Sequence, residues 1–204
     1  MPALMAAREG SRRIRIWCSA ASTGQEPYSL AISLKEMGKE LKGWRVEILA
    51  TDISNEVLEK AKAGIYTQFE VQRGLPALML IKYFAQVGES WQIAPEIRGM
   101  VKFMSLNLLD DFSHLGHFDL VFCRNVLIYF DQPTKTAVLD RVADVTERDG
   151  YLVLGGAETV VGLTSRFKLI ADKRGLYVQP QSGAAPSNVL SFPPPEPAIA
   201  GSRG

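Results

Sequence analysis

The sequence predicts an α/β protein built on a mostly parallel β-sheet with one antiparallel edge. Strand-like and helix-like segments alternate along the chain before residue 180, and repeated strand–helix–strand units form parallel sheets covered on both faces. The segment Phe118–Cys123 is almost continuously hydrophobic, which is typical of a strand buried on both faces. Near the end, residues 167–170 and 175–179 flank a short turn, as the strands of a hairpin do.

Turn and capping residues separate these elements. The first expected strand ends at Cys18 and leads into a turn-rich loop, 19–24. Ser54 is a helix-capping residue type and Gly64 favours a helix end, so the two bound a helix. Asp149 and Gly150 are expected to end the helix after the fourth strand. The expected strands are 15–18, 46–51, 101–104, 118–123 and 151–155, and the expected helices are 27–37, 55–63 and 133–148.

Two regions depart from this alternation. Residues 65–99 contain a helix-like run and a hairpin-like stretch between the second helix and the third strand, so we expect an inserted subdomain there. Residues 180–204 are rich in proline and small residues and have too little apolar surface to offset their ordering entropy. We therefore expect one domain over 1–179, which includes the insertion 65–99, and a disordered tail over 180–204.

Composition and charge exclude several classes of protein. The 204 residues are 47% hydrophobic and 22% charged, which suits one domain with a single core. The 23 Lys and Arg against 22 Asp and Glu leave a formal charge of +1, so no overall basic field attracts nucleic acid or an anionic membrane. No apolar run reaches the ~18 residues that cross a bilayer, and two cysteines make no disulfide framework. We expect a cytoplasmic protein without nucleic-acid binding or membrane insertion.

Polar residues follow every expected parallel strand. Open α/β sheets bind ligands beyond the carboxyl ends of their strands, so these residues are the candidates for a site. They are the loop 19–26, Asp52, Asn107, Arg124 with Asn125, and Glu158.

The loop after the first strand differs from a dinucleotide-binding loop. It has one glycine, Gly24, where a phosphate-binding loop has three, and Glu26 stands where the next helix starts. A carboxylate there repels phosphate and suits a positively charged cofactor without phosphate. S-adenosylmethionine, with its sulfonium and amino groups, fits. The alternative is that Glu26 only caps the helix beside Pro27.

Two further strand-end residues suit a nucleoside. Asp52 is placed to accept hydrogen bonds from ribose hydroxyls, and Asn107 offers the donor and acceptor that an adenine edge requires. Each has a purely structural alternative: an Asx-turn or N-cap before Ser54 for Asp52, and a turn for Asn107. The sequence leaves both alternatives open.

The segment 118–130 is the most specific. A buried strand runs directly into Arg124 and Asn125 and then into an apolar turn with one phenol, Tyr129. Arg124 keeps its charge, so at a strand end it should face a carboxylate or a cleft. The alternative for Tyr129 is core packing with its hydroxyl satisfied.

These residues resemble one family. Ser22-Thr23-Gly24-Gln25-Glu26-Pro27-Tyr28-Ser29, Ala50-Thr51-Asp52-Ile53, Asn107-Leu108-Leu109 and Phe122-Cys123-Arg124-Asn125-Val126-Leu127-Ile128-Tyr129-Phe130 closely resemble the chemotaxis receptor methyltransferases, the CheR family. The resemblance covers about residues 15–179. It implies a class I, Rossmann-like methyltransferase fold that binds S-adenosylmethionine and a role in chemotactic signal transduction. It also implies transfer of a methyl group to glutamate side chains on the cytoplasmic domain of chemoreceptors, which gives glutamyl methyl esters.

The resemblance also implies roles for individual residues. Glu26 would face the amino-acid or ribose part of the cofactor and Asp52 its ribose, while Asn107 and Leu108 would surround the adenine. Arg124 and Asn125 would lie near the methionine moiety and the substrate carboxylate, and Tyr129 near the methyl group. Arg124 and Tyr129 are the expected catalytic residues, no metal is expected, and residues 65–99 would contact the receptor.

The sequence departs from the family in two places. Gln25 stands where the family usually has a first glutamate, and the family's N-terminal helical domain, with its Thr-x-Phe-Phe-Arg segment, has no counterpart. We expect a monomeric catalytic domain of a truncated gene. The alternatives are a receptor-binding module that keeps the cofactor pocket without turnover, and a methyltransferase that acts on a small molecule or nucleic acid.

Overall fold

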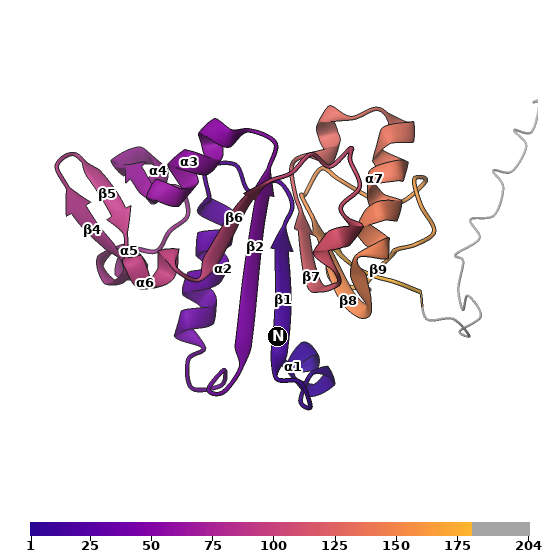
Figure 1. Cartoon of the computed structure of the whole chain (residues 1–204), viewed down its shortest axis with the longest axis horizontal. Coiled ribbons are helices and arrows are strands. Elements are labelled where there is room, and N and C mark those ends of the chain that lie inside the picture. The colour runs from indigo at the N-terminus through magenta and orange to yellow at the C-terminus, as the bar shows by residue number, and fades with distance from the viewer. Residues whose placement is uncertain (181–204) are drawn as a thin grey trace, which may run out of the picture.

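The computed structural model describes residues 1–180, and its main feature is a seven-stranded mixed sheet (Figure 1). The strands are β1 (Arg13–Cys18), β2 (Arg45–Asp52), β6 (Val101–Ser105), β7 (Phe118–Cys123), β8 (Thr146–Leu154), β9 (Lys168–Leu169) and β10 (Leu176–Val178). Their order is β6-β2-β1-β7-β8-β10-β9. The first five pair in parallel, and β10 pairs antiparallel with both β8 and β9. The predicted mostly parallel sheet with an antiparallel hairpin at one edge is confirmed.

Side chains of successive strand residues build one core on each face of the sheet. Ile14 and Ile16 of β1 pack on one face with helix α2 (Gln25–Glu36), whereas Trp17 packs on the other with helix α7 (Gln132–Asp144). Trp17 is fully buried, contacts the rings of Phe112 and Phe118, and donates its indole N–H to Thr51 Oγ1 at 3.0 Å. The period-two alternation of β1 thus anchors both layers of helices.

Helix α3 (Asn55–Ala63) has the boundaries that its capping residues predict. The Ser54 hydroxyl accepts the N–H of Val57 at 3.4 Å, and Gly64 ends the helix in the left-handed conformation at φ 63°. Leu58 and Ala61 on its inner side are fully buried. Helix α7 agrees less well with its predicted boundaries.

The predicted helix 133–148 is wrong at its carboxyl end, because α7 stops at Asp144. From Thr146 the chain is already strand β8, and the Thr146 hydroxyl donates to the Val142 carbonyl at 2.7 Å. The branched Val145–Thr146 pair favours extended backbone. Gly150 does not end a helix: a Cβ there would lie 2.9 Å from the carbonyl oxygens of Asp119 and Glu147, where the β7–β8 register shifts.

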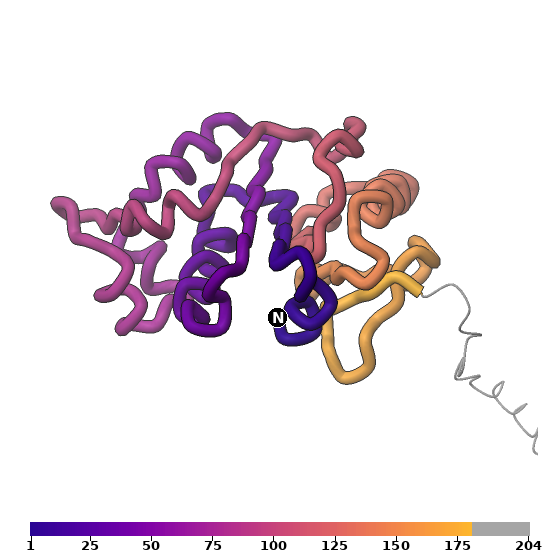
Figure 2. Tube along the Cα trace, turned by 60° about the horizontal axis from the view of Figure 1, so that its bottom comes forward, coloured from indigo at the N-terminus to yellow at the C-terminus, as the bar shows by residue number. Residues whose placement is uncertain are grey.

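The insertion forms a small layer of its own, seen in Figures 1 and 2 beside α3 at the far end from β8. Its three antiparallel strands have the order β3-β5-β4. The elements are β3 (Ile65–Thr67), α4 (Gln68–Gln72), α5 (Ala77–Tyr83), β4 (Phe84–Val87), β5 (Ser90–Ile93) and α6 (Pro95–Arg98). The helix and hairpin were expected, whereas β3 was not. Tyr66 of β3 connects this layer to the loop after β1 by donating its hydroxyl to the Thr23 carbonyl at 2.7 Å.

An N-terminal helix, α1 (Pro2–Ala7), was not predicted. Leu4 is buried, and Arg8 directly after the helix donates to the carboxylates of Asp119 at 2.6 Å and Asp149 at 2.5 Å. The Arg8 hydrogen bond lowers the pKa of Asp149 below its usual value. These ion pairs hold α1 at the amino ends of β7 and β8.

The predicted tail, apart from Pro180, lies outside the described residues. Both cysteines lie in the central strands, Cys18 in β1 and Cys123 in β7; each is fully buried and unbonded. None of the helices within residues 1–180 has the length and hydrophobicity to cross a membrane.

Replacing Leu152 tests the core on the α7 face. This side chain in β8 is fully buried, so Leu152→Ala should lower the free energy of unfolding by about 2–5 kcal/mol through lost burial and an unfilled cavity. Urea denaturation measures the loss. Leu78 in α5 is 78% exposed, and Leu78→Ala should change stability by less than about 0.5 kcal/mol. Equal losses in the two variants would contradict this assignment of the core.

Candidate functional site

The polar residues that follow the parallel strands meet at one edge of the sheet. Parallel pairing aligns Cys18 with Ala50 and with Phe122, and it aligns Cys123 with Leu154. Figure 1 shows the arrowheads of β1 and β2 pointing to that same edge. The loops after β1, β2, β7 and β8 are therefore neighbours, and their contacts define the candidate site.

The loop after β1 depends on Gly24. Its φ is +92°, and a Cβ would lie 3.0 Å from Ala61 Cβ and 3.1 Å from the Tyr66 hydroxyl, so both backbone conformation and space require glycine. Helix α2 begins directly after it at Gln25, two residues before the predicted start. Glu26 therefore lies in the first turn of α2.

Glu26 forms an ion pair with Arg124. Arg124 Nη1 lies 2.7 Å from Glu26 Oε2, and the side chains of Arg124 and Glu26 are 43% and 22% exposed. Burial raises the pKa of the Glu26 carboxyl above its ordinary value, and the Arg124 hydrogen bond opposes that rise. The helix-capping alternative for Glu26 finds no support, because no side chain within residues 1–180 caps the start of α2. Arg124 faces a carboxylate, as its place at a strand end predicted.

Asp52 and Asn107 both make the local turns that were their structural alternatives. Asp52 Oδ1 accepts the N–H of Ser54 at 3.0 Å, and its Oδ2 reaches across to the N–H of Ser22 at 2.9 Å. Asn107 Oδ1 accepts the N–H of Leu109 at 3.0 Å. A carboxylate has about four acceptor positions, so these bonds leave Asp52 able to accept two more.

The loop after β7 is held by Glu158, the polar residue after β8. Its two carboxylate oxygens accept backbone N–H groups of Asn125, Val126, Leu127 and Gly155 at 2.8–2.9 Å. The sequence indicated Glu158 as a strand-end residue without assigning it a role. Such a set of main-chain partners has no sequence pattern that would reveal it.

Tyr129 and Leu108 have opposite environments. Tyr129, in the short 3₁₀ turn η2 (Leu127–Tyr129), is 79% exposed, so the core-packing alternative for this residue is wrong. Leu108 is 6% exposed and packs in the core on the α7 face.

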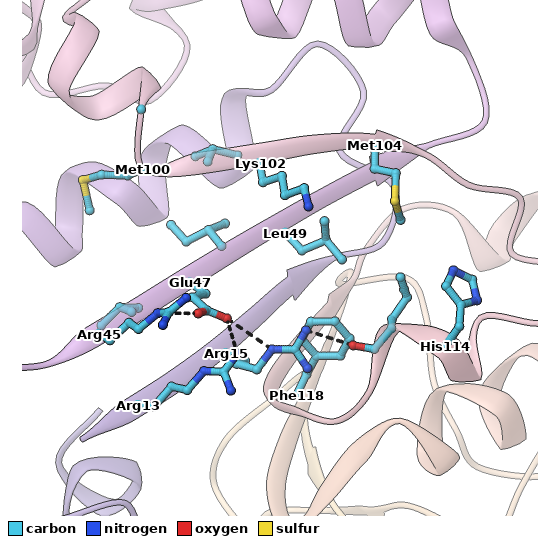
Figure 3. A pocket seen from close by; sticks show the side chains of 15 residues that line it. Arg13, Arg15, Arg45, Glu47, Leu49, Met100, Lys102, Met104, His114 and Phe118 are labelled. Atoms are coloured by element: carbon cyan, nitrogen blue, oxygen red, sulfur yellow. Dashed lines mark hydrogen bonds and ion pairs between the residues drawn. The ribbon is translucent and has the colours of Figure 1, made fainter. Parts of the chain in front are cut away.

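Two hollows in the surface bear on the location of the site, one lined by predicted site residues and one not. One of about 800 Å³ opens beside the carboxyl ends of β7 and β8, and Arg124, Glu158 and Arg174 line it. A second of about 620 Å³ lies on the exposed face of β1, β2 and β6 (Figure 3) and contains none of the predicted site residues.

A cluster of three arginines around one carboxylate borders the second hollow. In Figure 3 the Glu47 carboxylate points toward Arg13 and Arg45, which bind it at 2.8 and 2.6 Å, and Arg15 lies 3.4 Å away. The Arg13 hydrogen bond, with the neighbouring positive charges, lowers the pKa of Glu47. Within residues 1–180 no group of three His, Cys, Asp or Glu side chains is arranged to hold a metal.

Replacing Gly24 tests the loop after β1. Gly24→Ala should lower the free energy of unfolding by about 1–3 kcal/mol, because a side chain at this positive φ is strained and meets Ala61 and Tyr66. Gly10→Ala is the matched control and should not destabilise, because Gly10 has no positive φ and a Cβ added there would have no atom within 4 Å. Thermal unfolding of both variants measures the difference; similar melting temperatures would rule out the strain.

The pH dependence of stability tests the burial of Glu26. A carboxyl whose pKa rises on folding binds its proton more tightly in the folded chain, so stability falls as the pH rises through that raised pKa. Glu26→Gln removes this titration. The melting temperature of the variant minus that of wild type should therefore increase between about pH 4 and pH 7.

Glu47→Gln is the control of opposite sign. The pKa of Glu47 is lowered, so its stabilisation is present above the ordinary glutamate pKa and is lost as the pH falls through the lowered value. The melting temperature of Glu47→Gln minus that of wild type should therefore decrease as the pH rises. If the melting-temperature differences of Glu26→Gln and Glu47→Gln changed with pH in the same direction, the opposite pKa shifts of the two carboxyls would be contradicted.

The chain matches proteins of known family over most of its length. The family model "CheR methyltransferase, SAM binding domain" matches residues 1–176. Chemotaxis protein methyltransferase 1 of Pseudomonas aeruginosa is 42% identical over 181 residues, which cover 86% of this chain and 65% of the relative. The Escherichia coli chemotaxis protein methyltransferase is 40% identical over 169 residues, which cover 80% of this chain and 58% of the relative. The chain thus spans about three fifths of the length of these relatives.

Among solved structures, the magnesium protoporphyrin IX methyltransferase of Synechocystis with bound SAH aligns with a TM-score of 0.41 and 20% identity, over 79% of this chain and 54% of that one. The family match extends over nearly all the described residues and includes the entire candidate site. The matched domain is a domain that binds S-adenosylmethionine, and the chain belongs to the CheR methyltransferase family.

Proposed function

We propose that this chain transfers a methyl group from S-adenosylmethionine to glutamate side chains on the cytoplasmic domain of chemoreceptors, forming glutamyl methyl esters. The Glu26–Arg124 ion pair supports this proposal most directly. It places an acidic and a basic group together at the carboxyl edge of the sheet, in a chain of the CheR family. We propose further that the chain acts in the cytoplasm, in chemotactic signalling, as a monomer.

The residues at this edge fit the cofactor. Glu26 occupies the first turn of α2, the position where a dinucleotide-binding protein holds phosphate, and its negative charge disfavours phosphate there. A partly buried carboxylate suits an amino or sulfonium group instead. Asp52 keeps free acceptor positions toward ribose hydroxyls. S-adenosylmethionine, when bound, supplies an electrophilic methyl group on its sulfonium.

Different residues are proposed to contact different parts of the cofactor. In this proposal Glu26 faces the amino-acid or ribose part of the cofactor and Asp52 faces the ribose. Asn107 and Leu108 border the adenine, with the buried Leu108 supplying an apolar surface. Asn125 lies beside the methionine part.

Arg124 and Tyr129 act on the substrate side. An ionised glutamate is already a nucleophile, so this reaction needs no general base. Arg124 lines the hollow of about 800 Å³ beside β7 and β8, where its guanidinium can hold a glutamate carboxylate by paired hydrogen bonds. The exposed Tyr129 ring borders the place where the two substrates approach. Positioning of this kind accounts for several kcal/mol of barrier lowering in enzymes.

The insertion 65–99 is the proposed receptor-contacting part of the domain, which itself extends over 1–179. Several large apolar side chains on this insertion are exposed, which is typical of an interaction surface. They are Ile65, Phe69, Leu78, Ile81 and Val87.

Calorimetric titration with S-adenosylhomocysteine, followed by a methyl-transfer assay on chemoreceptor, tests the function. The proposal expects saturable binding and transfer to glutamate. Binding without transfer would instead support the receptor-interaction module, and absence of binding by the folded chain would overturn both.

Arg124→Ala should weaken S-adenosylhomocysteine binding and slow methyl transfer by about 10–100-fold each, because a charged hydrogen-bond partner is lost. Arg166→Ala is the matched control. Arg166 is also 43% exposed and also forms an ion pair, with Asp144 at the carboxyl end of α7, at 2.8 Å. The control should bind and react like wild type. Equal behaviour of the two variants would remove Arg124 from the site.

A further inference from the structure

Among residues 1–180, Glu158 accepts hydrogen bonds from the main chain of two loops and from no side chain. Its Oε1 accepts the N–H groups of Val126 and Leu127 at 2.9 and 2.8 Å. Its Oε2 accepts those of Asn125 and Gly155, both at 2.8 Å. Four donors fill the acceptor positions of a carboxylate. The side chain therefore fixes the path of the backbone at the ends of both β7 and β8.

The turn that Glu158 holds has an uncommon conformation. Asn125 has φ 58°, in the left-handed region that few non-glycine residues adopt. Three successive N–H groups, from Asn125 to Leu127, converge on one anion, as in the backbone nests that bind anions elsewhere. Hydrogen bonds to an ionised acceptor are about twice as strong as neutral ones. Asn125 is one of the non-glycine residue types that tolerate this conformation, and the charge on Glu158 stabilises the turn further through its three N–H groups.

Gly155 makes the close approach of this carboxylate feasible. A Cβ at residue 155 would lie 2.7 Å from Glu158 Oε2 and 3.1 Å from the backbone nitrogen of Asn125. Contacts below 3.0 Å force something to shift. Any side chain at this position would therefore push the carboxylate away from the turn.

The held turn connects directly to the proposed site. Arg124 immediately precedes it and extends to Glu26, and Tyr129 follows it within η2. Arg124 and Glu158 line the same hollow. A change in the backbone at Asn125 would therefore move groups on both sides of the turn.

We propose that Glu158 is the positioning residue of this site: its carboxylate fixes the Asn125–Leu127 turn and through it sets the placement of Arg124 opposite Glu26. Every hydrogen bond that Glu158 accepts within residues 1–180 comes from a main-chain N–H, so its proposed action on the site is through this turn. The inference rests on the proposed function only in taking the Arg124 loop as part of the cofactor site.

Glu158→Gln tests the proposal with an isosteric side chain. The amide presents one NH₂ donor toward backbone donors, so two of the four hydrogen bonds lose their acceptor. In the full 204-residue chain without ligand, amide hydrogen exchange at residues 125–127 should accelerate by about tenfold or more, while β1 and β2 keep their protection. The Kd for S-adenosylhomocysteine should rise by about tenfold or more at a temperature where the variant is folded.

Asp119→Asn separates positioning from general stability. Asp119 is another carboxylate that accepts a backbone N–H, from Arg15 at 2.7 Å, but it is buried and lies at the amino end of β7, away from the site. Both variants should melt at lower temperature than wild type. Only Glu158→Gln should change exchange at 125–127 and the Kd for S-adenosylhomocysteine. If Glu158→Gln does not fold, Gly155→Ala displaces the same carboxylate and takes its place.

Two results would overturn the role of Glu158: unchanged exchange at 125–127, or wild-type affinity for S-adenosylhomocysteine in the variant. Failure of the wild-type chain itself to bind S-adenosylhomocysteine would instead overturn the proposed function. The exchange measurement needs no ligand, so it still decides whether Glu158 holds the turn.

Discussion

Parallel pairing at the centre of the sheet is the constraint on which the rest of the structure depends. β1 lies between β2 and β7 and pairs in parallel with both. Its side chains alternate between two cores, and Trp17 joins β1 to Thr51 of β2 through a buried hydrogen bond. Because parallel strands all end on the same side, every loop that carries a candidate site residue emerges at one edge. The site is in this sense a consequence of strand direction.

Carboxylate and guanidinium side chains lie close together at that edge. Glu26 binds Arg124, and the loop that begins at Arg124 binds Glu158 through its backbone. Arg124 and Glu158 line the same hollow. Burial raises the pKa of Glu26, and the negative charge of Glu158 adds to that rise. Mixed charges in a partly buried place cost desolvation free energy, which is a common feature of functional sites.

Much of the sheet could be predicted because its signals are local. Ser54 and Gly64 bound α3 as their chemistry indicates, and the hydrophobic run of β7 has the predicted limits. Features that depend on distant partners could not be predicted. The ion pairs that fix α1 join Arg8 to residues 111 and 141 positions away. The candidate site divides in the same way. Strand ends indicated which residues to consider, but the Glu26–Arg124 pair joins positions 98 residues apart, and the four bonds of Glu158 involve backbone groups, which carry no residue identity at all.

The burial of both cysteines has a consequence for how this protein meets oxidants and alkylating reagents. Cys18 and Cys123 lie in adjacent central strands, and burial raises the pKa of both thiols, that of Cys123 to about 12. Thiolate, the reactive form, is therefore scarce while the domain is folded. Modification of either sulfur requires the central strands to unfold, at least transiently. The rate of thiol modification therefore reports how often the centre of the sheet unfolds.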